Sequence, residues 1–242
     1  MCGRYTLAAP DPAAIRARFP IGEQVEIRRR YNVAPGDDVL AVTTDRDGSP
    51  RGELLRWGLV PSWAESPRTG LRMINARVET LERRPAFRSA VQRFRCLIIS
   101  DGFYEWRRAE GGGKQPFHIT ASDHQPFAFA GLWSIWRPPA DSAGGRHTAQ
   151  APIRSCTIIT CPANAAVVNL HDRMPVILAR DHEQAWLDAT TPASVVAELL
   201  KTLPAERTEV RAVGTAVNDA RYDGPDCLAS PQDGVAPQAA LF

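Results

Sequence analysis

The sequence lacks any long apolar run. Its first ten residues, MCGRYTLAAP, contain no hydrophobic segment of the kind that a signal peptide carries. No later stretch of the 242 residues approaches the ~18 to 20 consecutive apolar residues that a membrane-spanning helix needs. We therefore expect a cytoplasmic protein with no membrane partner.

Cysteine is scarce, and its spacing argues against two kinds of site. The five cysteines are an odd number in a chain much larger than a disulfide-stapled mini-protein. The sequence has no Cys-x-x-Cys pair and no cluster of cysteine with histidine. It therefore predicts neither a disulfide framework nor a structural zinc site, and we expect no metal and no cofactor.

Lysine is nearly absent, so almost all of the positive charge is arginine. Residues 1–100 carry 17 Arg against 11 Asp and Glu, a net charge of +6, whereas the rest of the chain carries −4. Eight of these arginines lie between Arg68 and Arg95. Guanidinium groups suit phosphate, which favours a nucleic-acid partner. A GC-rich genome and solvated helix faces would give the same composition.

Short β-branched and aromatic runs bounded by Gly, Pro or Asp predict seven strands. They are Asp38–Thr44, Leu54–Val60, Arg95–Ser100, Phe103–Trp106, Phe117–Thr120, Phe127–Trp133 and Arg154–Thr160. The predicted helices are Asp11–Arg18, Thr80–Arg93 with its start near Arg84 because of Pro85, Asn164–Leu170, Asp181–Asp188 and Pro192–Thr202. Because strands and helices do not alternate regularly, the pattern favours an α+β fold.

No internal repeat or linker divides the chain, so we expect one domain over residues 1–228. Composition predicts mobile loops at Arg107–Lys114 and Pro138–Pro152, which are rich in small and turn-forming residues. We expect the tail, residues 229–242, to be disordered.

Cysteine at position 2 becomes the N-terminal residue once Met1 is removed. It then carries an α-amine and a thiol on adjacent carbons. The amine has a reference pKa near 7.7, so about a quarter of it is neutral at pH 7.2, compared with under about 0.1% of a lysine amine. An aldehyde attacked by this amine gives a Schiff base, and the thiol can then close a thiazolidine ring. Cys2 is therefore the candidate nucleophile.

Two further residues have the chemistry to move protons. Glu105 lies between Tyr104 and Trp106, where a low dielectric would raise its pKa toward neutrality. His171 follows an apolar stretch at a predicted loop, where catalytic groups are often presented. A surface glutamate and a structural histidine are the alternative interpretations of these two residues.

Arginine and tryptophan supply candidate contacts to DNA. Arg4, Arg77 and Arg173 lie in or next to polar motifs and suit phosphate, although each could equally form an ordinary ion pair. Trp57 and Trp63 flank a Gly- and Pro-containing turn, where stacking of an unpaired base is worth roughly 1 to 3 kcal/mol. Burial of both rings in the core is the alternative.

Six motifs in this order resemble the SOS response-associated peptidase (SRAP) family. They are Met1–Arg4, Arg30–Pro35, Trp57–Trp63, Asn75–Arg77, Asp101–Trp106 and His171–Leu178. The resemblance implies a single α+β domain with a bifurcated, mostly antiparallel sheet and a barrel-like centre flanked by helices. It also implies crosslinking to abasic sites in single-stranded DNA, next to a duplex junction. We expect a monomer.

The resemblance also assigns roles to individual residues. Cys2 would join the opened abasic sugar, Asn75 would hold Cys2, Glu105 would shuttle protons, and His171 would assist ring opening and reversal. The same site would remove residues preceding Cys2, which explains the word peptidase. The residues expected to contact DNA are Arg4, Asn32, Pro35, Trp57, Trp63, Arg77, Trp106, Thr160 and Arg173.

Two other functions use the same residues. A cysteine peptidase would combine Cys2 and His171 with an acid such as Glu105 or Asp172, and it would need a thiolate rather than a free amine. A non-catalytic reader of single-stranded DNA would use the arginines and tryptophans alone, and it would survive the loss of Cys2.

Overall fold

Five strands close into a barrel in the computed structural model. The structure describes residues 2–8, 11–108, 113–138 and 151–231. The barrel strands are β3 (Asp38–Thr44), β4 (Pro50–Trp57), β6 (Arg95–Ser100), β9 (Phe127–Trp136) and β10 (Ile153–Pro162). They pair in the order β4-β3-β6-β9-β10, and β10 pairs back with β4. The ring leaves no open edge between these strands.

Strand β10 exchanges partners on both of its edges, which bifurcates the sheet. Ser155 and Cys156 pair in parallel with β4, whereas Ile158 and the residues after it pair in parallel with β5 (Asn75–Arg77). On its other edge β10 leaves β9 after Ile158 and pairs with β11 (Arg173–Pro175). As a result, β5 and β11 flank the end of β10.

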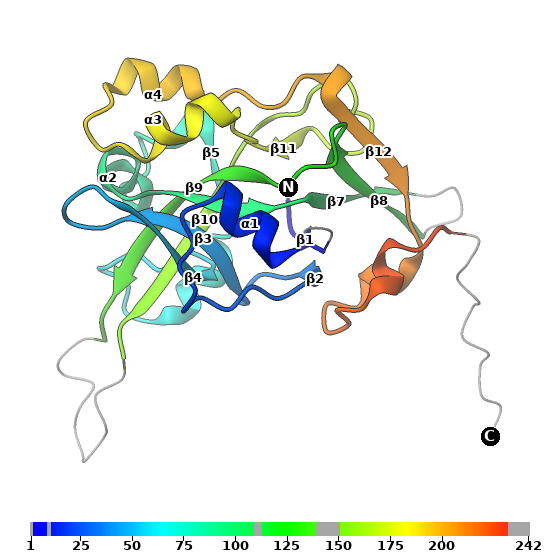
Figure 1. Ribbon diagram of the computed structural model, residues 1–242, viewed down its shortest axis with the longest axis horizontal. Helices are drawn as coiled ribbons and strands as arrows, with labels where there is room; N and C mark the ends of the chain where they lie inside the picture. The colour runs from blue at the N-terminus through cyan, green and yellow to red at the C-terminus, as the bar shows by residue number, and fades with distance from the viewer. Residues whose placement is uncertain (1, 9–10, 109–112, 139–150, 232–242) are drawn as a thin grey trace, which may run out of the picture.

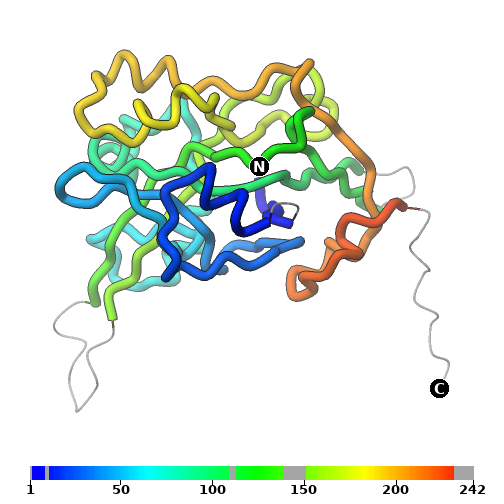
Figure 2. The backbone as a smooth tube through the Cα atoms, viewed as in Figure 1, coloured from blue at the N-terminus to red at the C-terminus, as the bar shows by residue number. Residues whose placement is uncertain are grey.

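A second, wholly antiparallel sheet packs beside the barrel. Its strands, in spatial order, are β12 (Thr208–Ala212), β8 (Lys114–Ala121), β7 (Gly102–Arg108), β1 (Tyr5–Leu7) and β2 (Arg30–Val33). The first strand of the chain therefore runs through the middle of the molecule (Figure 2). The Phe129 ring of the barrel meets the rings of Tyr5 and Phe103 edge-on, with centroids 5.7 and 6.2 Å apart. These contacts join the two sheets in one core.

The helices are short and lie outside the sheets (Figure 1). The α-helices are α1 (Pro12–Arg18), α2 (Pro85–Arg93), α3 (Glu183–Leu187) and α4 (Ala193–Leu199). The 3-10 helices are η1 (Pro67–Arg72), η2 (Val78–Thr80), η4 (Arg180–His182), η5 (Ala205–Arg207), η6 (Thr215–Asn218) and η7 (Pro225–Leu228). Among the described residues, no helix has the length and apolar character to cross a membrane.

The predicted α+β fold with a barrel-like centre is confirmed, and β3 and β6 have the predicted bounds. The predicted helix Asn164–Leu170 is wrong, because the Asn164 side chain accepts the N–H groups of Ala166 and Val167 and forms turns instead. The strand predicted at Leu54–Val60 is β4, which ends at Trp57. Gly58 follows at φ +126°, a backbone conformation that only glycine adopts freely.

Both predicted loops fall partly outside the described residues. Arg107 and Arg108 belong to β7, and Lys114 belongs to β8, so the first loop is shorter than predicted. Its residues 109–112, most of the second loop (139–150) and residues 232–242 of the tail are not described. The predicted disorder of these segments stays a prediction.

Candidate functional site

Cys2 is buried beside strands β5 and β7. The Tyr104 N–H donates to the Arg4 carbonyl at 3.0 Å, and the Asp101 N–H donates to the Thr6 carbonyl at 3.0 Å. Asn75 Nδ2 donates to the Cys2 carbonyl at 2.7 Å. Asn75 therefore holds the Cys2 carbonyl, and the backbone from Arg4 onward is held by β7 and the residue before it.

Glu105 lies on β7 and is only 3% exposed. Burial raises the pKa of its carboxyl, and the positive charge of His171 partly opposes that rise. Burial also raises the pKa of the Cys2 thiol far above its usual range, and the Glu105 carboxylate adds to the effect. The site therefore combines a protonated thiol with a carboxyl group suited to exchanging protons closer to neutrality.

His171 is half-buried, and its Nδ1 atom lies near two groups. The Arg173 backbone N–H is 2.9 Å from Nδ1, and Asp172 Oδ1 is 2.8 Å from it. An amide N–H can only donate, so in the neutral ring Nδ1 accepts and Nε2 carries the proton. In the protonated ring, Nδ1–H would instead donate to Asp172.

Four sequence-predicted residues therefore lie in one cluster. Asn75 contacts Cys2, and the charge of Glu105 acts on both Cys2 and His171. They come from the segment before β1, β5, β7 and the loop before β11; the bifurcation at β10 places β5 near β11, and β7 pairs with β1 in the second sheet. Among the described residues, no group of His, Cys, Asp and Glu has the arrangement of a metal site.

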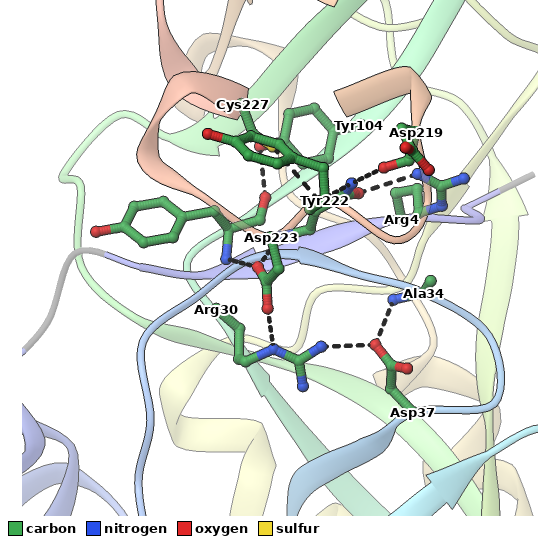
Figure 3. A network of polar contacts seen from close by, with 11 residues as sticks. Arg4, Arg30, Ala34, Asp37, Tyr104, Asp219, Tyr222, Asp223 and Cys227 are labelled. Atoms are coloured by element: carbon green, nitrogen blue, oxygen red, sulfur yellow. Dashed lines mark hydrogen bonds and ion pairs between the residues drawn. The ribbon is translucent and has the colours of Figure 1, made fainter. Parts of the chain in front are cut away.

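The C-terminal segment lies against the first and second strands (Figure 3). Arg4 Nη1 donates to Asn32 Oδ1 at 3.0 Å and to the Val217 carbonyl at 2.8 Å. Asp223 pairs with Arg30, and its carboxylate accepts two backbone N–H groups of β2. Asn32 is buried and therefore fixes Arg4 rather than presenting its own amide to solvent.

Arg77 and Arg173 differ in their surroundings. Arg77 is exposed. Arg173 is buried, donates through both terminal nitrogens to Glu79 at 2.5 and 3.0 Å, and also donates to the Thr160 carbonyl at 2.6 Å. Thr160 is itself buried, so its contact with the site passes through Arg173.

The aromatic residues predicted to contact DNA differ in their exposure to solvent. Trp57 has no exposed surface and donates its indole N–H to the Ile74 carbonyl at 2.9 Å, so no base can stack on it in this conformation. Trp63 is 62% exposed, and Pro35 is partly exposed. Trp106 is half-buried and donates to Asn218 Oδ1 at 2.7 Å.

Sequence reasoning missed a buried polar network under the first strand. The Thr6 hydroxyl donates to Asp101 Oδ1 at 2.5 Å and lies 3.0 Å from His118 Nε2. Burial lowers the pKa of His118 to about 3, so its ring is neutral. Because the Thr6 hydroxyl gives its one proton to Asp101, Nε2–H of His118 donates to the Thr6 oxygen. A Cβ on Gly102 would lie 2.2 Å from His118 Nε2, which explains the glycine of the Asp101–Trp106 motif. Gly102 is the one feature of the sequence that points to this network, because the network needs a residue without a side chain there.

Comparison with known proteins shows the family of this chain. The family model for SOS response associated peptidase (SRAP) matches residues 1–220. The chain belongs to the SRAP family. A SRAP relative from Bacillus subtilis (strain 168), named abasic site processing protein YoaM, is 39% identical over 234 residues, which cover 94% of this chain and 97% of the relative.

A second relative and a solved structure extend the comparison. The abasic site processing protein YedK of Escherichia coli (strain K12) is 31% identical over 235 residues, covering 94% of this chain and 99% of YedK. A crystal structure of a Bacteroides thetaiotaomicron protein has a TM-score of 0.77 at 22% identity, over 95% of this chain and 99% of that chain, and it supports the fold alone.

Proposed function

We propose that this SRAP protein recognises abasic sites in single-stranded DNA and joins them covalently through the N-terminal Cys2, which shields the lesion. The observation that carries the proposal is the buried cluster of Cys2, Asn75 and Glu105, in which Asn75 holds the Cys2 backbone beside a carboxyl group of raised pKa. The names of the relatives supply the lesion.

The chemistry proceeds without a change in oxidation state. The α-amine of Cys2 adds to the aldehyde carbon of the opened abasic sugar, forming a C–N bond, and the carbinolamine loses water to give an imine. Glu105 transfers the protons of this dehydration. The Cys2 sulfur then adds to the imine carbon while its proton moves to nitrogen, which closes the thiazolidine. His171 assists the reverse ring opening, in a lyase-like step.

The pKa of the Cys2 thiol favours this function over that of a general cysteine peptidase. A peptidase needs a thiolate, and burial disfavours the thiolate here. The crosslinking route uses a neutral amine first and the protonated thiol second. Within the proposal, peptide-bond cleavage is limited to release of whatever precedes Cys2.

The proposed DNA path runs over Arg4, Arg77 and Arg173, which hold phosphates flanking the lesion. Trp63, Trp106 and Pro35 line the path, with the duplex junction beside the lesion. The buried residues Asn32 and Thr160 act through Arg4 and Arg173, which they hold in place. We expect the protein to act as a monomer that associates with the nucleoid when bound to DNA.

Intact-mass measurement tests the proposal. Purified protein is mixed with an oligonucleotide containing one abasic site and with an undamaged control. We expect loss of Met1 and an adduct at the summed masses less one water, stable to heat without reduction. Acetylation of the α-amine should abolish the adduct while the thiol remains free. An adduct that survives amine acetylation would contradict the amine-first route, and binding without any adduct would favour a non-catalytic DNA reader.

A further inference from the structure

Glu79 forms an ion pair with Arg173, whose guanidinium the proposed function assigns to a DNA phosphate. Its two carboxylate oxygens accept from Arg173 Nη1 and Nη2. The Arg173 side chain is 10% exposed, whereas the Glu79 side chain is 48% exposed. The carboxylate is therefore the outer member of the pair and lies between the guanidinium and solvent.

The bifurcated sheet places Glu79 between two predicted phosphate contacts. Arg77 on β5 lies opposite Thr160 of β10, and Arg173 on β11 lies opposite Pro162 of the same strand. Two strands on either side of a third are roughly 10 Å apart. Glu79 follows β5 in η2 and reaches across to Arg173. Arg173 and, more weakly, Arg77 lower the pKa of its carboxyl.

A carboxylate and a phosphate make the same paired hydrogen bonds to a guanidinium. From the paired contacts of Glu79 with Arg173, we infer that Glu79 determines the affinity of this site for DNA: its carboxylate holds the place of a phosphate on Arg173 and leaves when the phosphate binds. The inference rests on the proposed function. It means that binding at Arg173 exchanges one anion for another, so Arg173 contributes little to the salt dependence of binding.

Binding of a fluorescently labelled, undamaged single-stranded oligonucleotide, measured by anisotropy over a range of salt concentrations, tests this inference. Glu79→Gln should bind DNA about 1.5- to fivefold more tightly, which is the range for release of a partly exposed ion pair. The salt slope should steepen by about 0.7, because an Arg173 without its carboxylate partner adds a net neutralised phosphate, and the DNA releases the counterion of that phosphate.

Two matched variants separate displacement from a general charge effect. Glu82→Gln makes the same change of charge three residues away and should leave the salt slope unchanged. Glu79→Asp keeps the charge on a shorter side chain that cannot reach Arg173 in the same way, so it should also bind more tightly than wild type. Thermal melting of each variant confirms that it is folded.

The Arg173→Gln background completes the cycle, because the gain from Glu79→Gln should vanish there. A gain that persists in that background, or an equal gain from Glu82→Gln, overturns the inference in favour of simple charge. Weaker binding by Glu79→Gln overturns it in favour of Glu79 as a support for Arg173. Wild-type protein that does not bind single-stranded DNA overturns the proposed function, and this inference with it.

Discussion

The barrel and the antiparallel sheet share one core, but among the described residues of these two regions the buried acidic and histidine side chains lie in or beside the antiparallel sheet. The barrel buries runs such as Leu97–Ile99 and Ala128–Ala130, which are fully apolar. The antiparallel sheet and its connection to β6 bury Asp101, Glu105 and His118, whose charged forms are costly to desolvate. Under the proposed function, substitutions in the barrel should mainly change stability, whereas substitutions at the buried carboxyl of Glu105 should mainly change the reaction.

The largest expected effect tests whether formation of the DNA adduct depends on Cys2. Cys2→Ala should abolish the heat-stable adduct with abasic single-stranded DNA, because no thiol remains to close the ring. Cys96→Ala is the matched control, since Cys96 is an equally buried thiol in the barrel. Denaturing gels measure both. A heat-stable adduct with Cys2→Ala protein would contradict the thiazolidine.

The second substitution should lower activity while increasing stability near neutral pH. Glu105→Gln should slow adduct formation by about 10² to 10⁴-fold, the range of general acid-base catalysis, at unchanged DNA affinity. Because burial raises the pKa of Glu105, its contribution to stability is fully present below the ordinary value of 4.5 and is lost as pH rises through the raised pKa.

The glutamine variant lacks that titration, so denaturant unfolding of Glu105→Gln should vary less with pH and should show a gain over wild type near neutrality. Equal rates of adduct formation in the two proteins would remove Glu105 from the proposed proton transfer. A loss of stability near neutrality would show that the carboxylate is compensated in the folded state.

The third effect should fall on stability alone. Ile98→Ala, at a fully buried barrel position, should lower the free energy of unfolding by about 2 to 5 kcal/mol, whereas Ile98→Val should cost about 0.5 to 1.5 kcal/mol. At a temperature where both variants stay folded, adduct formation should keep its wild-type rate. A slower rate in proportion to lost stability would mean that the two regions are not separable.

The smallest effect concerns reversal of the DNA adduct rather than its formation. His171→Ala should form adduct at a near-normal rate but release it up to about 10²-fold more slowly when unlabelled abasic DNA is added in excess. Time courses in both directions on denaturing gels measure this. Slower formation with unchanged release would contradict the assignment of His171 to reversal.

The sequence predicted the barrel better than the strands around the site. β3 and β6 are apolar runs with polar ends, so composition marks their bounds. β1, β5 and β11 have three residues each, too few for an alternation pattern, and they form because longer strands offer them an edge.

Among the candidate site residues, motifs identified the members of the cluster but not their partners. The pairing of Glu79 with Arg173 spans 94 positions, and nothing local in either segment predicts it. Trp57 and Trp63 share one motif, yet only the fold separates a ring inside the core from a ring on the surface. Residue type indicates possible chemistry, whereas accessibility is a tertiary property.

The bonds between the two ends of the chain have a consequence for biosynthesis. Arg4 and the Val217 carbonyl that it contacts are 213 positions apart. At about 5 to 20 residues per second, a ribosome needs roughly 10 to 40 seconds to translate from one to the other. During that interval the nascent chain holds its first strand without the C-terminal partner of Arg4. The segment that contains Cys2 therefore acquires its complete support only when translation of the domain is nearly finished.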